Sequence, residues 1–217
     1  MIDEITLIGF KCFASRSIPM KPLTVLAGLN NSGKSSVIQA IRMICLSKDG
    51  GSPLIAGYGS VEELRSRSVL PADDISLSFT SGNGSEGKLT LNSGGWTRAS
   101  AAPMSVYLSA DRWGPRLAHP ISRAFGGFPE LGVHGEHAAS FLEGFRDAIV
   151  PSELHHHRSE GATVQFEVAG WLGEIAPGVK LFYETDAKRD AAHIEFDGLR
   201  PTNSGFGLSY ALPVLAG

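Results

Sequence analysis

The sequence predicts an α/β fold, and three observations lead to this prediction. An apolar run at residues 23–27 comes first, a glycine-rich loop at 28–33 follows it, and apolar residues then recur at helical spacing from 35 to 46. Further segments rich in β-branched and aromatic residues are separated by Ser, Gly and Asn, which is typical of strands joined by turns. A strand, a tight loop and a helix in this order are typical of α/β proteins.

The remaining elements follow from the same patterns. The sequence predicts strands at 1–10, near Ile18, at 23–27, 75–80, 88–92 and 104–108, with a turn at 11–16. The segments at 164–166 and 181–183 are also strand-like, and those at 75–108 could form an antiparallel meander. Helices are predicted at 35–46, ending near 48–51, at 138–149 and at 208–212.

The loop beginning at Gly28 has the spacing of a phosphate-binding P-loop. Gly28 and Gly33 let the backbone curl so that N–H groups converge where the positive end of the next helix also points. Lys34 would reach the β- and γ-phosphates, and the Ser35 hydroxyl would coordinate Mg²⁺, with Ser36 next to it. The motif therefore predicts a nucleoside triphosphate site formed by Gly28, Asn30, Asn31, Ser32, Gly33, Lys34, Ser35 and Ser36.

Composition limits the class of protein. The 217 residues are 42% hydrophobic, which suits one substantial core, and the formal net charge of −3 neither supports nor excludes nucleic-acid binding. Cys12 and Cys45 are the only cysteines, too few for a disulfide framework. The N-terminus lacks the pattern of a signal peptide, and no apolar run approaches 18 residues. We expect a cytoplasmic protein without a membrane partner.

A second glycine-bearing segment lies near the C-terminus. Asn203-Ser204-Gly205 precedes the apolar stretch 208–212, so small residues leave the N–H groups of a predicted helix start exposed. Two interpretations stay open, a second anion-binding site and an ordinary helix cap.

Three parts of the chain together resemble a known family. These are Gly9-Phe10-Lys11-Cys12-Phe13, the block 23–36 and the segment 203–215. They resemble the ATPase head of the RecF/SMC-like, ABC-class proteins, and within that group the bacterial AAA-type proteins related to the OLD nucleases. The segment at 59–64 is similar to the loop that stands where related ATPases carry their Q-loop.

The resemblance implies a P-loop NTPase of the ABC/SMC-head type. Its expected parts are an N-terminal antiparallel β lobe with P-loop and helix at 1–50, an α/β insertion at 51–200 and a signature-like helix at 201–217. It further implies ATP and Mg²⁺ as ligands, Lys34 as the catalytic residue, and a homodimer in which Asn203, Ser204 and Gly205 contact the γ-phosphate held by the other protomer. DNA transactions or anti-phage defence, with DNA as a partner, are implied by the resemblance alone.

One element of such heads has no counterpart in the sequence. No apolar strand ends in the Asp-Glu pair of Walker B, whose carboxylates support Mg²⁺ and the attacking water. We therefore expect an incomplete head that hydrolyses ATP when a C-terminal half supplies Walker B. The alternatives are a non-hydrolysing ATP sensor that recruits an effector protein, and a P-loop kinase, for which Arg189 and Arg200 are too scattered to build a lid.

Two further patterns carry weaker predictions. The run His155-His156-His157 favours a solvated loop over a metal site, since consecutive side chains diverge. Asp111-Arg112-Trp113-Gly114 matches a GTPase pattern, but no guanine-reading motif accompanies it. Arg112 and Arg116 could approach phosphates or a partner, or make ordinary surface contacts.

Overall fold

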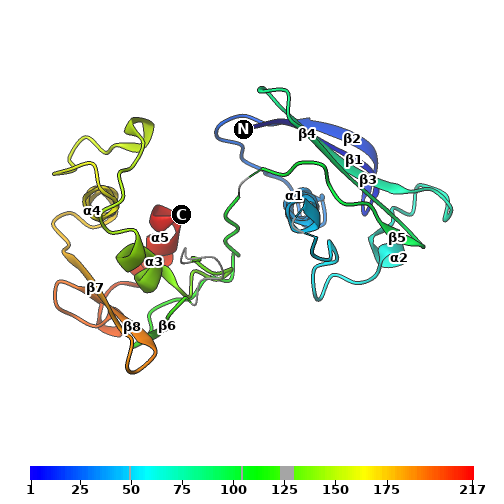
Figure 1. Ribbon diagram of the computed structural model, residues 1–217. Coiled ribbons are helices and arrows are strands. Elements are labelled where there is room, and N and C mark those ends of the chain that lie inside the picture. The colour runs from blue at the N-terminus through cyan, green and yellow to red at the C-terminus, as the bar shows by residue number, and fades with distance from the viewer. Residues whose placement is uncertain (49, 104, 123–129) are drawn as a thin grey trace. The chain divides into compact units, whose positions relative to one another are not determined.

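The computed structural model describes residues 1–48, 50–103, 105–122 and 130–217. These residues divide into two compact units, Met1–Ser105 and Val106–Gly217 (Figure 1). The boundary lies inside the segment 51–200 that the sequence analysis treats as one insertion. Each unit has its own sheet and its own hydrophobic core.

The first unit is an antiparallel sheet with helices. Its strands lie in the order β2-β1-β3-β4-β5, and every neighbouring pair is antiparallel. The predicted antiparallel lobe is thus present among the described residues. Of the predicted meander, the first two strands are present as β3 and β4, whereas the third strand of this run is β5 at Gly95–Trp96 and 105–108 form no strand. The elements are β1 Ile2–Phe10, β2 Phe13–Pro19, α1 Lys34–Lys48, α2 Val61–Leu64, β3 Ile75–Ser81, β4 Glu86–Asn92 and β5 Gly95–Trp96.

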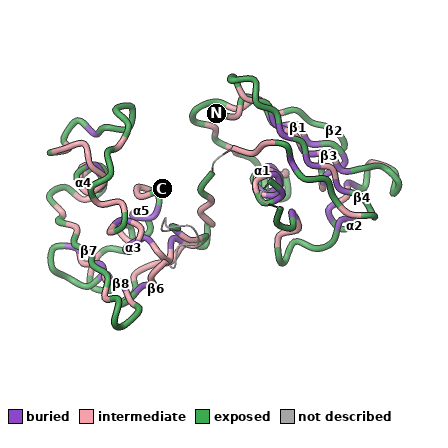
Figure 2. The backbone as a smooth tube through the Cα atoms, in the orientation of Figure 1, coloured by how far each residue is buried: buried purple, intermediate pink, exposed green. Residues whose placement is uncertain are grey.

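One face of this sheet packs against α1. Leu7 on β1 is paired with Leu77 on β3, which is paired with Leu89 on β4, and all three side chains are fully buried. Met43 and Ile44 of α1 belong to the same core, and Figure 2 shows the buried positions along these strands and this helix. The alternation of buried and exposed residues along β1 and β3 is what a sheet with one covered face requires.

Two local predictions differ from the structure here. The turn expected at 11–16 is confined to Lys11 and Cys12, because Lys11 adopts a positive φ of 49° and β2 already starts at Phe13. The segment 23–27 is not part of a strand. Leu23 and Val25 are 82% and 78% exposed, and no described strand pairs with this segment.

In the described residues of the second unit, a small sheet is combined with three α-helices. The sheet has the order β6-β8-β7, again antiparallel. Its core contains Leu142 of α3, Leu172 of α4, Ile194 of β8 and Leu212 of α5. The elements are β6 His119–Pro120, α3 Ala138–Gly144, η1 Ser152–Leu154, α4 Val164–Ile175, β7 Leu181–Asp186, β8 Ala191–Phe196, η2 Pro201–Asn203 and α5 Phe206–Ala216.

The sequence patterns are less reliable in this unit. The helices predicted at 138–149 and 208–212 are present as α3 and α5, but α3 ends at Gly144, and the strand at 181–183 lies within β7. The strand prediction at 164–166 is wrong, because Val168 and Leu172 are buried at the i, i+4 spacing of a helix. Met104 lies outside the described residues, and 105–108 belong to no helix or strand.

Cys12 and Cys45 are both free thiols. Among the described residues, no helix combines the length and the apolar character that crossing a membrane demands.

Leu7 and Ile8 are adjacent residues of β1, and their side chains lie on opposite faces of the sheet. Substituting each in turn tests which face of the sheet α1 covers. Leu7→Ala should lower the free energy of unfolding by about 2–5 kcal/mol, because it leaves a cavity beneath α1. Ile8→Ala on the opposite, 41% exposed side should cost less than about 1 kcal/mol. Urea unfolding followed by circular dichroism measures both, and equal losses would contradict the assignment.

His119 on β6 is a buried titratable group in the second unit. Its side chain is 7% exposed, and no hydrogen-bond partner for Nδ1 lies among the described residues. Burial is the main cause that lowers the pKa of His119 below the usual 6.5, and the charge of Arg116 acts in the same direction. The folded chain therefore holds this imidazole neutral where the unfolded chain already binds a proton.

This lowered pKa predicts a loss of stability in acid. As the pH falls through about 6.5, the unfolded state takes up a proton that folded His119 does not, so the free energy of unfolding should decrease. His119→Asn should flatten that decrease, whereas His155→Asn at an exposed position should not. Thermal unfolding from pH 7.5 to 5 measures the slopes, and an unchanged slope in His119→Asn would refute the prediction.

Candidate functional site

The glycine loop turns sharply before α1. Gly28, Asn31 and Gly33 have positive φ values of 152°, 65° and 93°, and α1 begins directly after Gly33. The N–H groups of Ser36 and Val37 donate to the Gly33 carbonyl at 3.0 and 3.1 Å. The first turn of a helix leaves its leading N–H groups without helical acceptors, so the loop presents donors at a positive helix end.

Gly33 has no room for a side chain. A Cβ at this position would lie 2.6 Å from both Cys12 Sγ and Phe13 Cζ, and the positive φ would strain any other residue as well. The turn between β1 and β2 thus lies directly against the start of α1. Local sequence around the loop does not reveal this contact.

Six of the predicted phosphate-binding residues line one hollow of about 450 Å³, and Lys11 and Cys12 line it as well. The six are Asn30, Asn31, Gly33, Lys34, Ser35 and Ser36. The lining among the described residues contains two lysines and no carboxylate. Such a cavity favours an anion.

The Lys34 side chain lies across the loop. Its ammonium donates to the carbonyl oxygens of Gly28 at 2.8 Å and Leu29 at 2.6 Å. Gly28 thus belongs to the site through its carbonyl, and Ser32 lies beside it, with its Oγ 2.9 Å from where a Gly28 Cβ would be. Ser35 is exposed, whereas Ser36 is 9% exposed and less accessible.

Lys11 is a lining residue to which the sequence analysis gives no role. Its backbone N–H donates to the Leu64 carbonyl at 2.8 Å, and its ammonium lies 5.1 Å from the centre of the Tyr58 ring. Burial lowers the pKa of Lys11. The stretch Gly9–Phe13, which contains Lys11, is one of the segments that resemble the family. This resemblance is the one sequence signal that points to Lys11.

The predicted second anion segment lies in the other compact unit. Asn203 ends the short helix η2, and Gly205 immediately precedes α5. The Ser204 hydroxyl donates to the Arg200 carbonyl at 3.3 Å, while Asn203 and Gly205 are exposed. This helix start is therefore open, and nothing in it requires a ligand.

No described strand supplies an Asp-Glu pair for the P-loop. The segment containing Asp111 is not a strand, and Glu184 lies on β7 in the second unit. The arginines near Asp111 make contacts within their own unit. Arg112 donates to the carbonyls of Tyr210 and Ser109, both at 3.3 Å, and the Arg116 guanidinium lies 4.0 Å from the Trp113 ring centre.

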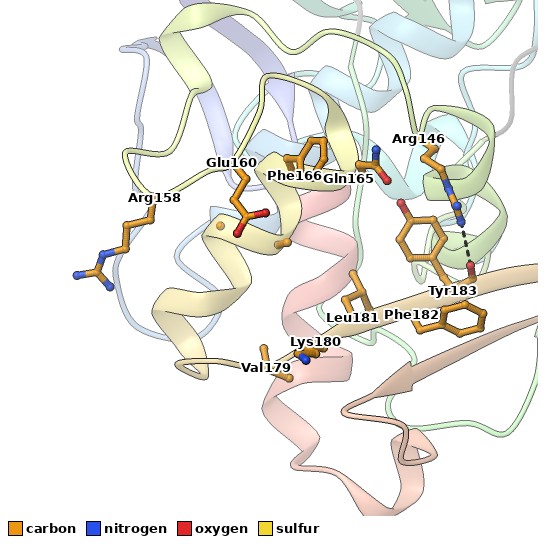
Figure 3. A pocket seen from close by; sticks show the side chains of 12 residues that line it. Arg146, Arg158, Glu160, Gln165, Phe166, Val179, Lys180, Leu181, Phe182 and Tyr183 are labelled. Atoms are coloured by element: carbon orange, nitrogen blue, oxygen red, sulfur yellow. Dashed lines mark hydrogen bonds between the residues drawn. The ribbon is translucent and has the colours of Figure 1, made fainter.

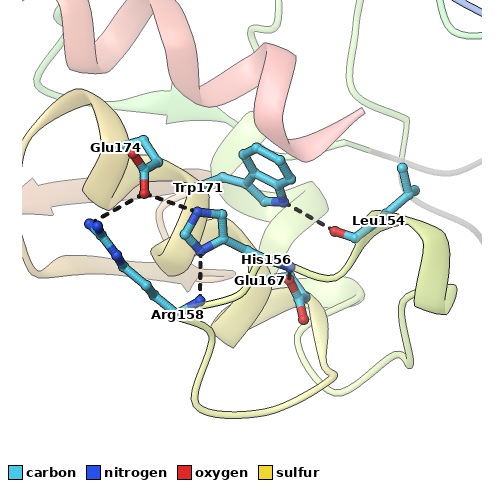
Figure 4. Close-up of polar contacts among 6 residues, drawn as sticks. All are labelled: Leu154, His156, Arg158, Glu167, Trp171 and Glu174. Carbon is cyan, nitrogen blue, oxygen red and sulfur yellow. Dashed lines mark hydrogen bonds and ion pairs between the residues drawn. The ribbon is translucent and has the colours of Figure 1, made fainter.

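The histidine run divides into exposed and buried members. His155 and His157 are exposed, but His156 is buried, so the prediction of a solvated loop is wrong for that residue. In Figure 4 the His156 ring points to Glu174, with Nε2 3.2 Å from a carboxylate oxygen, and Nδ1 accepts from the Arg158 N–H at 3.2 Å.

These contacts leave His156 no free nitrogen for a metal. Ligand atoms of His156, His157 and Glu174 lie within 4.8 Å of one another, close enough to consider a metal ion. A metal ligand needs an unprotonated nitrogen, yet Nδ1 already accepts a hydrogen bond and Nε2 must then carry the proton. The Arg158 guanidinium, 3.3 Å from Glu174, adds a competing cation. The cluster is structural.

Comparison with known proteins addresses the first part of the chain. Residues 1–78 match the family model of the AAA ATPase domain, which covers the P-loop, α1 and the start of β3. No curated protein matches the chain. The match supports an AAA-type P-loop ATPase family for these residues, and such domains generally bind ATP and Mg²⁺.

The contact at Gly33 gives a test of the loop geometry. Gly33→Ala should lower the free energy of unfolding by about 1–3 kcal/mol, because the new methyl group must displace Cys12 or Phe13. Gly94→Ala in the turn between β4 and β5 serves as the control, since its methyl group would meet nothing closer than 3.4 Å. Thermal unfolding compares the two variants, and equal stabilities would refute the proposed packing.

Proposed function

We propose that this chain binds ATP with Mg²⁺ at the loop from Gly28 to Ser36. The observation that carries the proposal is the hollow in which Lys34, Ser35 and the donors of the first α1 turn meet, without a carboxylate among the described lining residues. In it, Lys34 would exchange the carbonyls of Gly28 and Leu29 for phosphate oxygens, and Ser35 would coordinate Mg²⁺.

We further propose that the chain forms part of a RecF/SMC/OLD-like ATPase head acting in the cytoplasm. In such a head, Asn203, Ser204 and Gly205 of one protomer would contact the γ-phosphate bound to another, so that ATP closes a homodimer. The open start of α5 supports this role. DNA transactions or anti-phage defence would be the setting, by resemblance.

Hydrolysis requires carboxylates from elsewhere. A segment with a Walker B strand would pack beside residues 23–27, where the side chains of Leu23 and Val25 are exposed. A C-terminal half or a separate protein could supply it. The second candidate is an ATP sensor that recruits an effector without turnover, and the described lining of the hollow, which contains no carboxylate, supports it.

Lys34→Ala tests ATP binding. The substitution should weaken ATP binding by at least about tenfold, because it removes a charge-assisted hydrogen bond to phosphate. Lys48→Ala removes a lysine from the far end of the same helix and should bind as the wild type does. Isothermal titration calorimetry with Mg²⁺ present measures both, and binding that does not depend on Lys34 would refute the proposed site.

Turnover separates the two candidate functions. Phosphate release by the chain, at several protein concentrations, should be low alone and should rise when the Walker B-bearing segment or partner is added. ATP binding that persists without turnover under both conditions would favour the sensor.

A further inference from the structure

An exposed tyrosine lies close to the P-loop hollow. Tyr58 belongs to the loop between α1 and α2, and it is 39% exposed. Its backbone N–H donates to the Ile55 carbonyl at 3.1 Å, and Gly57 and Gly59 on either side have positive φ values of 83° and 91°. These values suit glycine and turn the chain on both sides of the tyrosine. A tight loop therefore presents the ring at the surface.

Backbone hydrogen bonds join this part of the chain to the end of β1. The Lys11 N–H donates to the Leu64 carbonyl at 2.8 Å, and the Ser66 N–H donates to the Gly9 carbonyl at 2.8 Å. Leu64 ends α2, the short helix that follows the tyrosine loop. The loop is thus fixed at both of its neighbours, by the sheet on one side and by α2 on the other.

Lys11 connects the tyrosine to the hollow. Lys11 is one of the residues that line the hollow, and its ammonium lies 5.1 Å from the Tyr58 ring centre and 6.0 Å from the Phe10 ring centre. No carboxylate pairs with Lys11 among the described residues. Ring faces bind a cation more weakly than a phosphate oxygen does. A molecule with its phosphates in the hollow would therefore meet Lys11 and, beside it, the Tyr58 ring.

The second unit offers a comparison. There a pocket of about 430 Å³ also has a cation and aromatic rings in its lining, among them Arg146 and Phe182 (Figure 3). Arg146, however, is ion-paired with Glu143 at 2.6 Å and donates to the Tyr183 carbonyl at 3.2 Å. Its charge is thus already used within the fold, whereas that of Lys11 is not.

The P-loop hollow itself offers no aromatic surface. Its described lining contains no aromatic residue, and the Phe13 ring packs against Gly33. A nucleotide with its phosphates in the hollow carries a flat base at its other end. Bases stack on aromatic side chains through their π faces, a contact that every base can make. Tyr58 is an exposed ring of this kind, in contact with a residue of the lining.

We propose that Tyr58 is the base-stacking residue of the nucleotide site, with Lys11 next to the phosphate that carries the nucleoside. This inference rests on the proposed ATP binding at 28–36 and adds the position of the base. Stacking contact grows with the area of the base, so a two-ring purine gains more from Tyr58 than a one-ring pyrimidine does. Tyr58 would thereby give the site a preference for purine nucleotides.

Isothermal titration calorimetry of the full chain, with Mg²⁺ present, tests this role. Tyr58→Ala should weaken ATP binding by at least about fivefold, because it removes the stacking surface. Its affinity for inorganic tripolyphosphate, which has the phosphates without a base, should equal that of the wild type. Tyr58→Phe keeps the ring and should restore ATP binding. The wild type should bind ATP more tightly than CTP, and Tyr58→Ala should reduce that difference.

A matched control uses another exposed aromatic residue of the same unit. Trp96 is 47% exposed on β5, which β3 and β4 separate from β1, so Trp96→Ala should bind ATP as the wild type does. A wild-type chain that binds neither ATP nor tripolyphosphate would overturn this proposal together with the ATP site. Unchanged ATP binding in Tyr58→Ala, or an equal loss of ATP and tripolyphosphate binding, would overturn the base-stacking role alone.

Discussion

The first unit depends on a contact that is possible only without a side chain at Gly33. The β1–β2 turn, with Cys12 and Phe13, lies against the start of α1 because Gly33 leaves space for it. The same contact places Lys11 and Cys12 at the rim of the P-loop hollow. Because β1 also joins β2 to β3, the loop geometry is connected to the centre of the sheet. The phosphate-binding loop is therefore supported by tertiary packing as well as by its glycines.

The described residues that line the P-loop hollow are positively charged or polar. The described lining of the hollow supplies lysines, a hydroxyl ligand and helix N–H groups, all of which stabilise phosphate charge. Activation of a water molecule needs a carboxylate, and the described lining offers none. Lys34 hydrogen-bonds to the carbonyls of Gly28 and Leu29, whose dipoles stabilise its charge. The described lining is thus suited to hold an anion.

The second unit buries a polar cluster whose members satisfy one another. Glu167 accepts from the His156 backbone N–H at 2.6 Å, and the His156 ring contacts Glu174. Satisfied buried groups hold a fold in one arrangement. These contacts therefore fix the loop that contains His156 against α4, from which Glu167 and Glu174 project.

The sequence by itself determined the glycine turn before α1, α1 itself and most strands of the first unit. These features depend on local conformation and on apolar periodicity, which neighbouring residues specify. Tertiary structure decided the rest. Apolar residues at 164–168 fit a strand or a helix equally, and packing of Val168 and Leu172 selected the helix. Lys11 lines the P-loop hollow, His156 is buried, and Arg146 donates to the Tyr183 carbonyl. Each of these arrangements brings together residues that are distant in sequence, and no local pattern encodes such contacts.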